Sequence, residues 1–140
     1  MKFILVLLSL MMFSHQKDNS NQLVLNITNI KNSQGVIRVL LFKDGKGFPD
    51  TPENAFQSAN VKIVNGKSTV TFENIPNGFY AISVFHDSMN TGKLRTNSFG
   101  IPKDGYGFSN NAMGTFGPPS FEKAAFEVSS GSKSVEIQLR

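Results

Sequence analysis

The chain contains no cysteine and no tryptophan among its 140 residues, and it has only two histidines. The absence of cysteine excludes disulfide frameworks, thiolate metal sites and a cysteine nucleophile. Two histidines are too few for most multi-histidine metal and acid–base schemes. Charged residues make up 17% of the chain and hydrophobic residues 39%, so a chain of this length can bury the core of one domain. We therefore expect a single folded domain without disulfide bonds.

Clustered positive charge is also missing. The formal net charge is +4, but the lysines and arginines are scattered along the chain and form no run. Binding to the phosphates of a nucleic acid requires a concentrated basic stripe. The sequence therefore favours an ordinary solvated surface and no nucleic-acid partner.

The first residues resemble a targeting segment. Lys2 precedes a largely apolar run of eleven residues, Phe3 to Phe13, and polar residues follow. The run is too short to span a bilayer comfortably, and this arrangement is typical of a secretory signal peptide. We predict a signal peptide over residues 1–15, a polar linker over 16–22 and one domain over 23–140. The cleaved protein would be exported without a membrane span; an uncleaved anchor is the alternative.

After this segment, apolar and polar residues alternate with a period of two, which is typical of half-buried β-strands. The pair Asn65-Gly66 predicts a tight hairpin turn. We predict an all-β fold, a seven-stranded antiparallel β-sandwich, with a small closed barrel as the alternative. The alternating segments lie at residues 23–28, 37–41, 61–63, 68–73, 80–84, 124–128 and 134–139.

One short helix is predicted between these strands, around residues 51–59. Thr51 would be its N-cap, Pro52 its first residue and Glu53 part of its first turn. We interpret it as part of a crossover between strands.

Residues 86–120 break the alternation. They contain six of the twelve glycines and three of the six prolines. Irregular connections of more than about 15 residues are uncommon in compact domains and are usually functional or disordered. Four aromatic residues argue against disorder, so we expect an ordered loop that either presents a recognition surface or closes one end of the sandwich. The predicted ligand contacts are Phe99, Tyr106, Phe108 and Phe116, with Asn110 and Asn111 as polar specificity groups.

One pair of adjacent residues is a candidate for catalysis. His86 is the only histidine after the predicted signal peptide, and Asp87 follows it. Adjacent side chains on a strand point to opposite faces, so we do not expect an acid–base dyad. We predict a non-catalytic domain without a cofactor. The alternatives are a small envelope hydrolase using His86 and Asp87, and a purely structural envelope protein.

A family resemblance rests on the run from Ile75 to Phe126. It contains IPNGFYAISVFHD, then TGKL, then FGIPKDGYGFSNNAMGTFGPPSFEKAAF, of which GIPKDGYGFSNNA is highly specific. The chain resembles the DUF2141 family of small exported bacterial proteins over about residues 23–140. The resemblance implies a transthyretin-like or immunoglobulin-like sandwich in the bacterial cell envelope, periplasmic or extracellular, with no established reaction. Compatible partners are a glycan, a peptide or another envelope protein.

The family pattern also contains a segment that is similar to a calcium-binding loop. Family members typically read H-D-x-N-x-N-G-x-L-D after the fifth strand, which is similar to the start of a calcium loop. Here Asp87 and Gly92 match, but Met89 replaces an oxygen ligand and Arg95 replaces an acidic residue. One carboxylate cannot readily offset the dehydration of calcium. We expect no metal site, with Asp87 and Asn90 as weak residual candidates.

Overall fold

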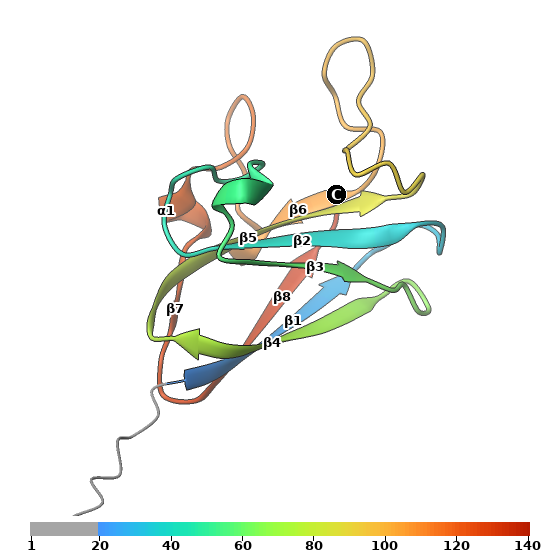
Figure 1. Ribbon diagram of the computed structural model, residues 1–140. Helices are drawn as coiled ribbons and strands as arrows, with labels where there is room; N and C mark the ends of the chain where they lie inside the picture. The colour runs from blue at the N-terminus through green and yellow to red at the C-terminus, as the bar shows by residue number, and fades with distance from the viewer. Residues whose placement is uncertain (1–19) are drawn as a thin grey trace, which may run out of the picture.

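Two β-sheets packed face to face form the body of the molecule (Figure 1). The computed structural model describes residues 20–140, so the predicted signal peptide lies outside the described residues. One sheet has the strand order β4-β1-β8 and the other β3-β2-β5-β6, with β7 paired to the beginning of β5. The prediction of an all-β, two-layer fold is confirmed.

The described part of the chain contains eight strands rather than seven. The additional strand, β6, lies within the predicted loop, and β1 begins at Ser20 rather than Leu23. The prediction of a wholly antiparallel arrangement is wrong for one pair, because β1 runs parallel to β8. The bounds are β1 (Ser20–Thr28), β2 (Val36–Phe42), β3 (Gln57–Val61), β4 (Ser68–Pro76), β5 (Gly78–Asp87), β6 (Tyr106–Phe108), β7 (Phe126–Val128) and β8 (Ser132–Gln138).

The main core lies between the two sheets. It is built largely from alternate residues of strands such as β1, β2 and β5, as the period of two predicts. Each fully buried aliphatic or aromatic side chain contributes about 1.5–3 kcal/mol to the hydrophobic stabilisation of the fold. The largest of these side chains include Leu23, Leu25, Ile27, Ile37, Val39, Leu41, Ile75, Tyr80, Ile82, Ile137 and Leu139.

The turn at Asn65-Gly66 is confirmed. Both residues have positive φ, 52° and 73°, and Val64 and Lys67 exchange backbone hydrogen bonds of 2.8 and 3.1 Å. The strands on either side nevertheless belong to different sheets, because β3 pairs with β2 and β4 pairs with β1. The turn therefore connects the two layers of the sandwich.

The predicted helix at residues 51–59 is largely wrong. Only Pro52–Asn54 forms a single 3₁₀ turn, and Thr51 makes no side-chain capping bond. From Gln57 onwards the chain is strand β3, paired along β2. Long-range strand pairing thus outweighs the local preference for helix at the end of this segment.

Residues 86–120 form two loops rather than one. Strand β6 and a 3₁₀ turn, Ser109–Asn111, divide the segment, and helix α1 (Phe121–Ala124) follows it. We call residues 88–105 the first loop and residues 112–120 the second loop. Both project from the same side of the five-stranded sheet (Figure 1). None of the helices within residues 20–140 is long and apolar enough to cross a bilayer.

Candidate functional site

The outer face of the five-stranded sheet carries the candidate site. On β5, Ile82 and Val84 point into the core, so Ser83 and Phe85 point to the opposite face. Ser83 is paired with Phe108 and Phe85 with Tyr106, so these β6 side chains lie on the same outer face. The β2 residue paired with Ser83 is Leu40, which adds a further apolar side chain to this face.

A cleft of about 630 Å³ lies over this outer face. Its floor includes Leu40, Phe85 and Tyr106, and its volume is typical of sites that bind small ligands. The walls come from three segments far apart in the sequence. They are residues 92–94, Gly100 and Pro102 of the first loop, residues 113–115, Gly117 and Pro118 of the second loop, and Pro49, Asp50 and Pro52 before β3.

A second apolar cluster supports one end of the cleft. The ring of Phe48 contacts Phe42, Phe108 and Phe121 edge to face, with centroid separations of 5.5, 6.1 and 6.0 Å. Phe108 is buried in this cluster, and its ring centroid lies 6.1 Å from that of Tyr106. Of the predicted contacts, Tyr106 and Phe108 therefore do line the cleft, and Phe108 also helps to hold the fold together.

Asn110 and Asn111, predicted as specificity groups, are exposed, but their side chains bond to the protein's own backbone. The amide of Asn110 donates to the carbonyl oxygens of Lys123 (3.2 Å) and Ala125 (2.8 Å). The Oδ1 atom of Asn111 accepts from the backbone N–H of Gln138 at 3.0 Å. Neither residue lines the cleft. They fix the 3₁₀ turn after β6 to α1 and β8.

Phe99 and Phe116 lie at the tips of the two loops rather than in the cleft. Their side chains are 88% and 102% exposed, respectively. Asn97 shapes the first tip, because its Oδ1 accepts from the N–H groups of Phe99 (2.9 Å) and Ile101 (3.0 Å). In the second loop, a Cβ on Gly114 would overlap the backbone carbonyl of Gly117. The tips are therefore compact turns with defined backbone contacts.

The base of the first loop is closed by Asp104. Its carboxylate accepts from Nε and a terminal nitrogen of Arg95, both at 2.8 Å, and from the Ser88 hydroxyl at 3.0 Å. The hydrogen bonds from Arg95 are the main reason why the pKa of Asp104 is lowered. This carboxylate thus joins the two ends of the first loop. Arg95, which replaces an acidic residue of the family pattern, is thus paired with Asp104.

Asp87 is the last residue of β5, directly before the first loop, and its side chain is 1% exposed. Its Oδ1 accepts from the N–H of Thr91 (2.9 Å), and its Oδ2 accepts from the N–H of Gly92 (2.7 Å) and from Nε of Arg38 (2.5 Å). Burial acts to raise the pKa of Asp87, but the bonds from Arg38 and the two backbone groups outweigh it and lower the pKa. An ionised carboxylate is thereby held beneath the cleft wall at Gly92.

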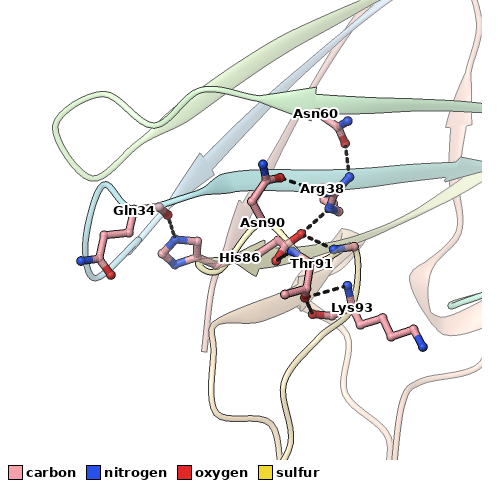
Figure 2. A network of polar contacts seen from close by, with 9 residues as sticks. Gln34, Arg38, Asn60, His86, Asn90, Thr91 and Lys93 are labelled. Carbon is pink, nitrogen blue, oxygen red and sulfur yellow. Dashed lines mark hydrogen bonds and ion pairs between the residues drawn. The ribbon is translucent and has the colours of Figure 1, made fainter.

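The two residual metal candidates share Arg38 as a partner. Besides Asp87, its guanidinium donates to the side-chain oxygens of Asn90 (3.0 Å) and Asn60 (3.2 Å), as Figure 2 shows. The cation that these side-chain oxygens surround is therefore the guanidinium group of Arg38. Within residues 20–140, histidine, aspartate and glutamate form no cluster of three or more suited to a metal ion.

His86 and Asp87 face opposite sides of the sheet. The Nε2 atom of His86 lies 2.6 Å from the carbonyl oxygen of Gln34, and the residue is 3% exposed (Figure 2). Asp87 points instead towards Arg38 on the outer face. His86 does not line the cleft. The two residues thus form no acid–base pair.

The sequence did not indicate the cleft residues that come from other strands, notably Leu40 and Phe85. One signal was available: β2 ends in the apolar run Val39–Phe42, with side chains on both faces of the strand. A strand at the surface of a sandwich alternates, whereas one that is apolar on both faces is covered on both. This run therefore indicated a second apolar surface outside the sandwich core.

Comparison with known proteins identifies the family. No curated protein matches the chain. Among solved structures, the pilus-presented adhesin Spy0125 (Cpa) matches 86% of this chain and 27% of its own chain, with 12% identity and a TM-score of 0.28. The chain thus spans about a quarter of that adhesin chain, and similarity this weak supports no argument. The family described as an uncharacterized protein conserved in bacteria, DUF2141, matches residues 25–136, and the chain belongs to this family.

Proposed function

We propose that this protein is an exported, non-catalytic binding module of the bacterial cell envelope and that its ligand enters the cleft between the two loops. The observation that carries the proposal is a cleft of about 630 Å³ with an apolar floor and walls from three separate segments. One of these walls, the first loop, is supported by two buried or paired carboxylates, Asp87 and Asp104. A cleft formed before binding loses less conformational entropy when the ligand enters.

The chemistry of the floor narrows the ligand class. Leu40, Phe85 and Tyr106 offer apolar and aromatic surface, whereas the hydroxyl of Ser83 already donates to the carbonyl of Pro49 at 2.6 Å. The charged groups, Asp50 and Lys93, belong to the walls. Of a glycan, a peptide and an envelope protein, this distribution favours a peptide or protein segment that inserts an apolar side chain.

A charge placed in the floor should weaken binding of an apolar probe. We expect Leu40→Lys to weaken binding of the uncharged fluorescent probe N-phenyl-1-naphthylamine by about tenfold or more, because the ammonium group must be desolvated when the aromatic probe enters. The measurement is saturable probe fluorescence in titrations of the folded protein. Val64→Lys is the matched control, since Val64 is an exposed aliphatic residue at the turn between β3 and β4.

The outcome separates a binding cleft from an inert groove. Leu40 is half-buried, so the lysine can extend towards solvent and we expect the variant to fold. Circular dichroism and a melting curve establish that it does. Equal probe affinity in wild type and folded Leu40→Lys would contradict the proposed site.

Export is a separate part of the proposal, based on the apolar segment at the start of the chain. The full-length chain, expressed in a bacterium, should appear in the periplasm or the medium with residues 1–15 removed. Cell fractionation followed by mass spectrometry measures both properties. A chain retained in the cytoplasm at full length would refute export while leaving the cleft unaffected.

A further inference from the structure

The two loop tips expose aromatic rings that no part of the described fold covers. Phe99 and Phe116 are 88% and 102% exposed, and Ile101, beside the first tip, is 58% exposed. Single exposed apolar residues are common on protein surfaces. Here, however, each of two loops that project from the same side of the molecule ends in a solvated phenylalanine (Figure 1). Two apolar tips that project from one side can meet the surface of the same partner.

The backbone holds these rings outward. Thr96 and Pro102 pair across the base of the first tip, and Asn97 bonds to the backbone of Phe99 and Ile101. The second tip is closed by the close backbone approach at Gly114. The rings are thus presented on short turns, at little further entropic cost when they meet a partner.

The charges carried by the two loops themselves have one prevailing sign. Residues 88–120 contain three basic residues, Lys93, Arg95 and Lys103, and one acidic residue, Asp104, which gives a net charge of +2. Arg95 and Asp104 neutralise each other in an ion pair. The excess charge therefore belongs to Lys93 and Lys103, on the loop that carries Phe99. The second loop is uncharged.

We infer that the two loops dock on the surface of an anionic lipid bilayer, with Phe99 and Phe116 in the boundary between headgroups and acyl chains. Aromatic rings are favoured at that depth, and nearby lysines bind anionic headgroups. A stable protein interface needs about 800 Å² of continuous complementary surface on each partner. Two separate tips on either side of a cleft lack that continuity, whereas a fluid bilayer accommodates them without matching their shape.

The absence of tryptophan makes the inference directly testable. Phe99→Trp and Phe116→Trp each introduce a single fluorescent reporter into the full chain. Phe79→Trp is the matched control, because Phe79 is 60% exposed and lies at the end of β5 remote from the first loop. Any membrane binding by the N-terminal apolar segment is common to all three variants and cannot produce a difference between them.

We expect emission at positions 99 and 116 to shift to shorter wavelength with vesicles of phosphatidylcholine and phosphatidylglycerol, and to be quenched by brominated acyl chains. Emission at position 79 should not change. High salt, or the double substitution Lys93→Glu and Lys103→Glu, should weaken vesicle binding by about tenfold or more. The membrane inference goes beyond the proposed cleft function and does not depend on it.

Three results would overturn the inference. The first is unchanged emission at positions 99 and 116 in folded protein. The second is an equal shift at position 79, and the third is an equal affinity for vesicles of phosphatidylcholine alone. Recovery of an envelope-protein complex that is lost when both phenylalanines are replaced by serine, without any vesicle binding, would identify a protein as the partner instead of lipid.

Discussion

Replacing Arg38 with methionine should lower the free energy of unfolding by about 2–4 kcal/mol at neutral pH, because it leaves a buried carboxylate without its cation. Asp87 is 1% exposed and the Arg38 side chain is 25% exposed, so solvent screens this pair only weakly. In the variant, Asp87 would keep the backbone donors of Thr91 and Gly92 but no positive charge. Urea unfolding followed by circular dichroism measures the loss.

The pH dependence distinguishes a charge effect from lost packing. The pKa of Asp87 is lowered in the folded protein, so its contribution is present above the unfolded-state pKa and is lost as the pH falls through the folded-state value. Without Arg38, burial acts to raise this pKa, and protonation then relieves the buried charge. The difference between wild type and Arg38→Met should therefore be largest at neutral pH and should shrink below about pH 4.

A double-mutant cycle provides the control. Arg38→Met should cost less in an Asp87→Asn background, where no buried charge is left unpaired. The same loss in both backgrounds, and at every pH, would show that Arg38 acts only through the packing of its aliphatic chain.

Arg38→Met should also weaken binding of the fluorescent probe. Arg38 holds Asp87, and Asp87 in turn accepts from the N–H of Gly92, which lies in the wall of the cleft.

Local pattern explains why most strands were predictable. Leu23, Leu25 and Ile27 are all fully buried, as their alternation required, and the core-facing residues of β2 and β5 are buried as well. Strand β6 could not be found in this way. Its three residues lie among glycines, and it exists because β5 and the backbone of Arg140 provide its hydrogen-bond partners. Alternation also carries no information on direction, so the parallel pairing of β1 with β8 was not predictable.

The candidate site was predictable only in part, because it is assembled from distant segments. Tyr106 and Phe108 were identified as aromatic residues in a glycine-rich segment, and both line the cleft. The amides of Asn110 and Asn111 fit a polar contact role by type, but each holds a backbone more than ten residues away. Leu40 reaches the cleft only through the pairing of β2 with β5. Such pairings depend on the whole fold rather than on spacing along the chain.

Replacing Gly35 with alanine should lower the free energy of unfolding by about 3 kcal/mol or more and the melting temperature by about 10 °C. Gly35 has a φ of +69°, and an added Cβ would overlap the backbone carbonyl of Asp87. The backbone of one of the two segments must therefore move. The preceding residue, Gln34, accepts a hydrogen bond at its carbonyl oxygen from Nε2–H of His86, with an N···O distance of 2.6 Å. A shift of this turn would disrupt that bond as well.

Gly100→Ala separates this close contact from the general cost of a left-handed backbone. Gly100 has a similar φ of +76°, but nothing lies within 4 Å of its added Cβ. We expect Gly100→Ala to lower the free energy of unfolding by only about 1 kcal/mol, which is the cost of holding an alanine in the left-handed backbone conformation. Thermal and urea unfolding of both variants measure the difference. Equal losses would mean that the turn before β2 can move away from Asp87, and that Asp87 depends on Arg38 and the first loop alone for its position.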